Sequence, residues 1–283
     1  MDLNAPRGTF QAMADDTRQN VEALLVGESL AREAAPVLTG LDCRYESVSD
    51  LAEAENRLQT RPFPILMAME SLIPAMVAAA NRNYPHHFIG GTPPNLRDLR
   101  FTVQKLRSGE IFGIERYDIP VQEKIDLQGG ESRYPAIDRI KAYFLGAGVA
   151  GRIVDKVELA IHELVMNADR RRAELKSENR PIALAYGLNK DALAVSVRDS
   201  FGDLDAATLF AAIRRASVEK SVLEAPGRGA GLGLFLSLKA CGNLVINVAS
   251  GRATEAIAIF HRVKSLGEAA KMGHSFHYFQ EQP

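Results

Sequence analysis

The sequence contains few cysteines, with only Cys43 and Cys241 among its 283 residues. Two cysteines so far apart form neither a disulfide framework nor a four-thiolate zinc site. No stretch approaches the roughly 18 consecutive apolar residues that a membrane-spanning helix needs. Residues 1–18 lack the basic segment and apolar run of a signal peptide. These absences predict a cytoplasmic protein with a flexible leader at residues 1–18.

Neither sign of charge is in excess, because the sequence has 34 basic and 35 acidic residues. A net charge of −1 provides no overall field for nucleic acid or for an anionic membrane. The chain is 46% hydrophobic and 24% charged, which is typical of a globular protein of one or two domains.

Residues 19–117 alternate between short apolar runs and helical stretches. Strand-like runs occur at Val21–Val26, Cys43–Val48 and Ile65–Met69, and a helix is expected over Asn95–Leu106. Such βαβα alternation favours a parallel sheet covered by helices. Residues 118–135, which contain Gly129, Gly130 and Pro135, are expected to be a linker.

The second half, residues 136–263, has a different order of elements. In the segment 153–171, apolar side chains recur at gaps of three and four, which predicts one long helix with a buried stripe. Two hairpins and two further helices are expected, and residues 264–283 are expected to form a C-terminal tail. The strands are placed at 181–188, 192–198, 244–248 and 256–260, and the helices at 208–218 and 234–240.

Glu163 and Asn167 lie four residues apart and therefore on one face of the long helix. An asparagine oxygen can ligate Mg²⁺, and a neighbouring carboxylate can polarise a water or hydroxyl for attack on phosphorus. Taken alone, the pair also fits two solvated positions on an amphipathic helix.

Two further motifs have the chemistry of a nucleotide site. Asp199 ends an alternating strand and is followed by Gly202, so its carboxylate can accept a hydrogen bond from an exocyclic amine, although such a segment also suits a plain turn. Gly227–Gly233 alternates glycines before a helix, and exposed backbone N–H groups there can cradle phosphate, although a hinge has the same composition. The Gly-Lys-Ser/Thr of a P-loop is missing from it.

Together and in this order, the three motifs resemble the ATP-binding module of the GHKL superfamily, which includes histidine kinases, gyrase, Hsp90 and MutL. Glu163 and Asn167 resemble its N box, Asp199 to Gly202 its G1 box, and residues 229–233 its G2 box. The resemblance implies an α/β fold of two parts. These are an N-terminal receiver-like (flavodoxin-like) parallel α/β domain at residues 19–117 and a C-terminal Bergerat α/β sandwich at residues 136–263.

The resemblance also implies ATP and Mg²⁺ as ligands. Asp199 would bind the adenine amino group, Asn167 would ligate Mg²⁺, and Glu163 would be the catalytic base. Residues 203–228 would form a lid, with Arg214, Arg215, Lys220 and Arg228 available to the phosphates. The remaining nucleotide-binding residues would be Gly202, Gly229, Gly231, Leu232, Gly233 and Thr254.

The chain departs from the family pattern at two places. Phe201 stands where the G1 box usually has glycine, and Gly202 comes one position later, which predicts a reshaped loop under the adenine. Arg252 stands where the family often has glycine before threonine, and Ala253 intervenes.

Within the superfamily, the chain is most similar to anti-sigma-factor serine kinases, which act on a partner protein. His162 lacks the setting of an autophosphorylated histidine, and the pair His86 and His87 fits a strand start better than a metal pair. The N-terminal half resembles a response-regulator receiver, but its third strand ends in Met69 and Glu70 rather than aspartate. The resemblance thus implies a pseudo-receiver that serves in docking or dimerisation, as in a two-component system.

Three functions remain open from the sequence. The chain could be a Mg-ATP-dependent serine/threonine kinase that phosphorylates a regulatory partner. It could be a non-catalytic module in which nucleotide switches a binding surface. It could also be a scaffold that has lost ATP. The sequence does not identify the partner, and it does not decide whether the chain forms a homodimer.

Overall fold

The computed structural model describes residues 21–68, 86–91, 95–177, 179–218, 232–262 and 273–281. Several residues of the sequence-based predictions lie outside these ranges. They are the leader 1–18, Glu70, Lys220, Arg228, Gly229 and Gly231. Arg214, Arg215 and Leu232 lie in helices, but their side chains are not among those described.

The N-terminal half is a parallel α/β unit, as the alternation of its sequence predicts. Its elements are β1 (Glu22–Val26), α2 (Glu28–Gly40), β2 (Arg44–Val48), α3 (Leu51–Thr60), β3 (Ile65–Ala68), β4 (His87–Gly90) and α5 (Leu96–Ser108). The strands run parallel in the order β2-β1-β3-β4. β3 is buried throughout, which is typical of a parallel strand covered on both faces.

The C-terminal half is built on antiparallel strands in the order β8-β9-β7-β6-β5. Its elements are η1 (Ile114–Tyr117), β5 (Glu123–Leu127), α6 (Tyr134–Gly146), α7 (Gly151–Glu174), β6 (Ile182–Leu188), β7 (Ala192–Asp199), α8 (Ala206–Val218), α9 (Leu232–Ala240), β8 (Asn243–Ala249), β9 (Ala253–His261) and β10 (Ser275–Gln280). The two predicted hairpins are β6–β7 and β8–β9.

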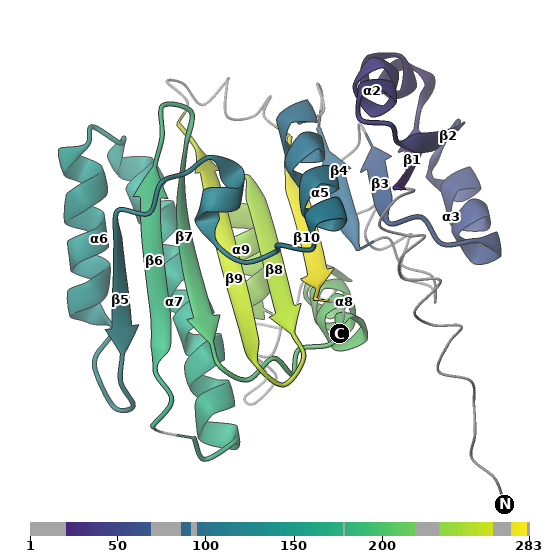
Figure 1. Cartoon of the computed structure of the whole chain (residues 1–283). Helices are drawn as coiled ribbons and strands as arrows, with labels where there is room; N and C mark the ends of the chain where they lie inside the picture. The colour runs from purple at the N-terminus through teal and green to yellow at the C-terminus, as the bar shows by residue number, and fades with distance from the viewer. Residues whose placement is uncertain are drawn as a thin grey trace, which may run out of the picture.

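Both halves share one ten-stranded sheet, and β10 is the strand that joins them (Figure 1). It runs antiparallel to β4 and parallel to β8. The expected tail 264–283 therefore contributes an interior strand, and the expected linker 118–135 contributes the edge strand β5. The first five residues of β10 are all buried, so the segment lacks the polar-apolar alternation that would mark a strand in the sequence.

Helices cover the sheet on two sides. α6, α7 and α9 lie behind it in the view of Figure 1, and α5 and the short helix η1 lie in front. The predicted stripe of α7 is confirmed, because all five of its residues are buried against the rear core: Ile153, Val157, Ala160, Leu164 and Ala168. The structure is thus the α/β fold that the sequence predicts, and helix α7 is held firmly against β7 and β9.

None of the helices in the described ranges is long and apolar enough to cross a membrane. Within the same ranges, no three His, Cys, Asp or Glu side chains are grouped so that they could hold a metal ion. His86 packs edge-on against the ring of Tyr278, with the ring centroids 5.5 Å apart. His87 lies 4.3 Å from the ring of Phe279.

Candidate nucleotide site

A cavity of about 460 Å³ opens between α7, the end of β7 and the start of α8. Asn167, Asp199 and Thr254 all line it, although they come from three separate elements. The structure therefore brings together the predicted metal ligand, the predicted purine-binding carboxylate and the threonine that follows the β8–β9 turn. The cavity has the size that small-molecule sites usually have.

Asp199 is fixed at the end of β7 by backbone groups. Its Oδ1 accepts hydrogen bonds from the backbone N–H of Phe201 at 2.9 Å and of Thr254 at 3.2 Å. Burial raises the pKa of Asp199, and these backbone bonds only partly oppose the effect. Because both bonds fall on Oδ1, the other carboxylate oxygen keeps its capacity to accept from a ligand.

Thr254 faces Asp199 across the β7–β9 pair and is 8% exposed. Its Oγ1 is buried and has no hydrogen-bond partner in the structure. A buried hydroxyl without a partner is costly, so it marks a place where a ligand or a water belongs. The carboxylate and hydroxyl together suit a flat heterocycle with an amino group beside an acceptor nitrogen.

Gly202 follows Asp199 in a conformation that favours glycine, with φ of 66°. A Cβ at this position would come closer than 3.0 Å to the backbone of Ala249, Arg252 and Ala253. Its carbonyl also accepts a hydrogen bond from Gly251 N–H at 2.9 Å. The loop after Asp199 is therefore clamped to the β8–β9 turn by Gly202, while Phe201 is buried beneath it.

Gly202→Ala is expected to lower the free energy of unfolding by about 3 kcal/mol, because it adds backbone strain and a steric clash. Gly251→Ala is the matched control, since Gly251 has φ of 69° but open space around its Cβ position. That control should lose only about 1 kcal/mol, from strain alone. Urea denaturation of both variants measures the difference, and equal losses would refute the clamp.

The N-box residues Glu163 and Asn167 have different surroundings. A Cβ on Gly233 would collide with Oε2 of Glu163, so this carboxylate lies directly against the first turn of α9. Asn167 lies one turn further along α7 and lines the cavity. Glu163 is not among the residues that line the cavity, so of the pair only Asn167 lies there, and the residues that precede α9 lie outside the described part of the chain.

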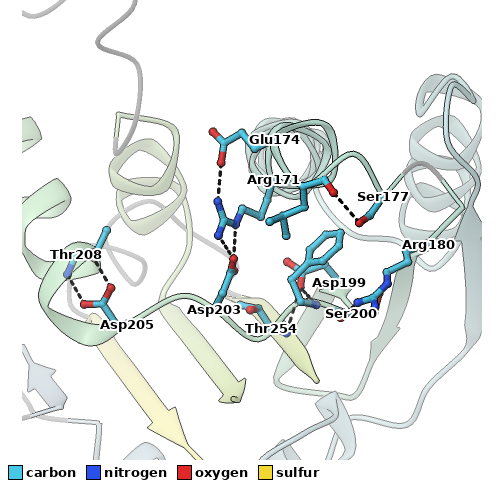
Figure 2. Close-up of polar contacts among 12 residues, drawn as sticks. Arg171, Glu174, Ser177, Arg180, Asp199, Ser200, Asp203, Asp205, Thr208 and Thr254 are labelled. Atoms are coloured by element: carbon cyan, nitrogen blue, oxygen red, sulfur yellow. Dashed lines mark hydrogen bonds and ion pairs between the residues drawn. The ribbon is translucent and has the colours of Figure 1, made fainter. Parts of the chain in front are cut away.

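Sequence reasoning missed Arg171, which lies at the edge of the cavity. Its guanidinium pairs with Asp203 on the loop after β7 and with Glu174 at 2.8 Å, as Figure 2 shows. Asp203 and Glu174 line the same cavity. The spacing of Asn167 and Arg171 on one helix face was the available signal, but the partner Asp203 is distant in sequence.

Asp205 fixes the beginning of α8 beside the cavity. Its carboxylate accepts from the backbone N–H of Thr208 at 2.8 Å and from its hydroxyl at 2.6 Å (Figure 2). These bonds lower the pKa of Asp205. The first turn of α8 is thereby held at the entrance, where the lid predicted for residues 203–228 begins.

Comparison with known proteins adds a distant likeness of fold. No protein-family model and no curated protein matches the chain. A solved structure, the SiaB-SiaC complex from Pseudomonas aeruginosa, overlaps it with a TM-score of 0.36 and 19% sequence identity. The overlap covers 50% of this chain and 89% of that chain. A likeness of this strength gives no basis for assigning a function.

Proposed function

We propose that the chain binds MgATP in the cavity beside Asp199 and transfers the γ-phosphoryl group to a serine or threonine of a partner protein. The observation that carries the proposal is that Asn167 and Asp199 line one cavity. The unpartnered Oγ1 of Thr254 supports a polar ligand there.

The described donors and acceptors suit the purine and the metal ion of a nucleotide. Asp199 and Thr254 lie at the purine end, where the carboxylate accepts from the exocyclic amine. Asn167 would hold Mg²⁺ through its side-chain oxygen, and the ion would neutralise phosphate charge. The N–H groups at the start of α9 would donate to phosphate oxygens.

Glu163 would act as the base in the transfer. Its carboxylate accepts the proton of the partner's hydroxyl as that oxygen bonds to the γ-phosphorus, and the bond to the bridging oxygen breaks so that ADP leaves. Glu163 is partly buried and lies against the first turn of α9, next to the positions proposed for the phosphates. No phosphoacceptor on this chain is needed.

Glu163→Gln is expected to reduce phosphoryl transfer by roughly 100-fold to 10,000-fold, because it removes the base and keeps the shape of the side chain. The affinity for MgADP should stay within about twofold, since Glu163 does not hold the purine. Transfer is measured by incubating the protein with γ-labelled ATP and a protein extract that supplies the partner. The quantity counted is the acid-stable label on phosphoserine and phosphothreonine.

Glu158→Gln is the matched control five residues earlier on α7. Glu158 pairs with Lys141 of α6 at 2.5 Å, whereas Glu163 lies against Gly233 of α9, so the loss of the Glu158 carboxylate should leave transfer unchanged. Equal transfer by wild-type protein and Glu163→Gln would refute the catalytic assignment.

The alternative function is a non-catalytic module that nucleotide switches. The ion pair between Arg171 and Asp203 favours it, because this contact ties α7 to the loop that leads into α8. A bound nucleotide could exchange that pair for its own contacts and so move the start of the lid. Tight MgADP binding without any transfer to protein would support this function over the kinase.

A further inference from the structure

A second group of buried polar atoms lacks hydrogen-bond partners, on the face of the sheet opposite the nucleotide cavity. Seven such side-chain atoms occur in the described part of the chain, and two of them, on Ser200 and Thr254, lie at the candidate nucleotide site. The other five gather around β10 and its neighbours: His87 Nδ1, Asp98 Oδ1, Asn243 Oδ1, His261 Nε2 and Ser275 Oγ. Such a concentration marks a place where a ligand or ordered water belongs, and three of the five residues, Asp98, Asn243 and His261, line one cavity.

A cavity of about 370 Å³ lies at this place, under the N-terminal turns of α5 and against the ends of β8 and β9. Asp98, Asn243 and His261 line it, and the rings of Phe101 and Tyr117 form an aromatic wall. Its volume suits a small organic molecule. The cavity is separate from the one beside Asp199, since the two share no lining residue.

Hydrogen-bond acceptors dominate the floor of the cavity. Asp98 is 2% exposed, and its Oδ2 is bonded to Nε2 of His277 at 2.8 Å. Burial opposes the charge of Asp98, but His277, Ser275 and Asn243 bring the pKa below its usual value. None of these three forms a hydrogen bond of normal geometry with Oδ1. Asn243, 3% exposed, adds a second oxygen in need of a donor.

Positive groups dominate the rim. Arg97, Lys190 and Arg262 line the cavity together with Asp191, and Arg97 also pairs with Asp118 at 3.6 Å. Arg97 donates to Asp191 at 2.8 Å, and Arg262 donates to the carbonyl of Asn189 at 2.9 Å, whereas Lys190 is exposed. The backbone N–H groups of the first turn of α5 add partial positive charge at this rim.

We propose that this cavity binds a free α-amino acid. The ammonium group would donate to Asp98 and Asn243, and the carboxylate would lie at the rim near Lys190 and the start of α5. The side chain would pack along Phe101 and Tyr117. A molecule without hydrogen-bond donors would leave the acceptors of the floor unsatisfied, and a simple amine would leave the cations of the rim unused.

Calorimetric titration of the full chain with each of the twenty common L-amino acids tests the proposal. At least one should bind with a stoichiometry of one, and its N-acetyl derivative should bind at least about tenfold more weakly because it has lost the ammonium group. The absence of binding by all twenty at up to about 10 mM, where even a weak site fills, would overturn the proposal. Equal binding of the N-acetyl form would overturn it as well.

Two substitutions locate the binding. Asn243→Ala removes an acceptor of the floor, and Lys190→Ala removes an exposed cation of the rim, so each should weaken binding by about threefold to thirtyfold. If Asn243→Ala fails to fold, Lys190→Ala still tests the site, because the side chain of Lys190 is exposed and its loss should not disturb folding. Lys176→Ala, exposed and outside the cavity, is the control. Unchanged affinity in both cavity variants would place the amino acid elsewhere and refute the site.

Discussion

Asp199→Asn is expected to weaken MgADP binding by roughly 100-fold, which corresponds to about 2.7 kcal/mol. The amide oxygen can still accept from the backbone of Phe201 and Thr254, so the loop should keep its shape. The amide nitrogen, however, would then face the amino group of the purine, and two donors would oppose each other. Isothermal titration of wild-type protein and variant measures the loss.

Asp126→Asn is the control for this prediction. Asp126 is an exposed carboxylate on the edge strand β5, and it does not line the cavity. Its substitution makes the same change in charge, so any general electrostatic effect on an anionic ligand will appear in both variants. Affinity that falls equally in the two, or in neither, would contradict the assignment of Asp199 to the purine.

Phe276→Ala is expected to lower the free energy of unfolding by about 3–5 kcal/mol. Phe276 is fully buried on β10, and its ring lies 5.6 Å from that of Phe210 on α8. Phe210 in turn contacts Phe88 on β4 at 5.7 Å. The three rings connect the N-terminal half, the joining strand and the helix at the entrance of the cavity, so the substitution leaves a hole where all three meet.

Urea denaturation followed by circular dichroism measures this effect. Gln280→Ala, at the exposed end of the same strand, should change stability by less than about 0.5 kcal/mol. Should Phe276→Ala prove too unstable to purify, Phe276→Leu should still lose roughly 1–1.5 kcal/mol. A loss below about 1 kcal/mol for the alanine variant would mean that residues 275–280 belong to a tail outside the core, as the sequence indicated for residues 264–283.

The local patterns of the sequence predicted most of the elements. The parallel direction of β1, β2 and β3 follows from the alternation of strands and helices, and the buried face of α7 follows from its spacing of three and four. The end of β7 at Asp199 follows from the alternation that stops there. Each of these features depends on residues that are close together in the chain.

Long-range pairings could not be predicted in this way. β10 is short and buried on both faces, so neither its pattern nor its length indicates that it lies between β4 and β8. The ion pair of Arg171 with Asp203 depends on the approach of α7 to a loop 32 residues further along the chain. The role of Gly202 could not be predicted from the sequence, because the backbone atoms with which a Cβ at this position would clash lie on the β8–β9 turn.

A crystal structure of the full chain with MgADP tests the central claim most directly. The account predicts the exocyclic amine of the purine within about 3 Å of the carboxylate of Asp199, as a hydrogen bond requires, with Asn167 on the magnesium ion. The hydroxyl of Thr254 should gain a partner in the complex. Nucleotide bound at another surface, or a cavity in which Asp199 and Thr254 keep their present contacts while ADP is at saturation, would contradict it.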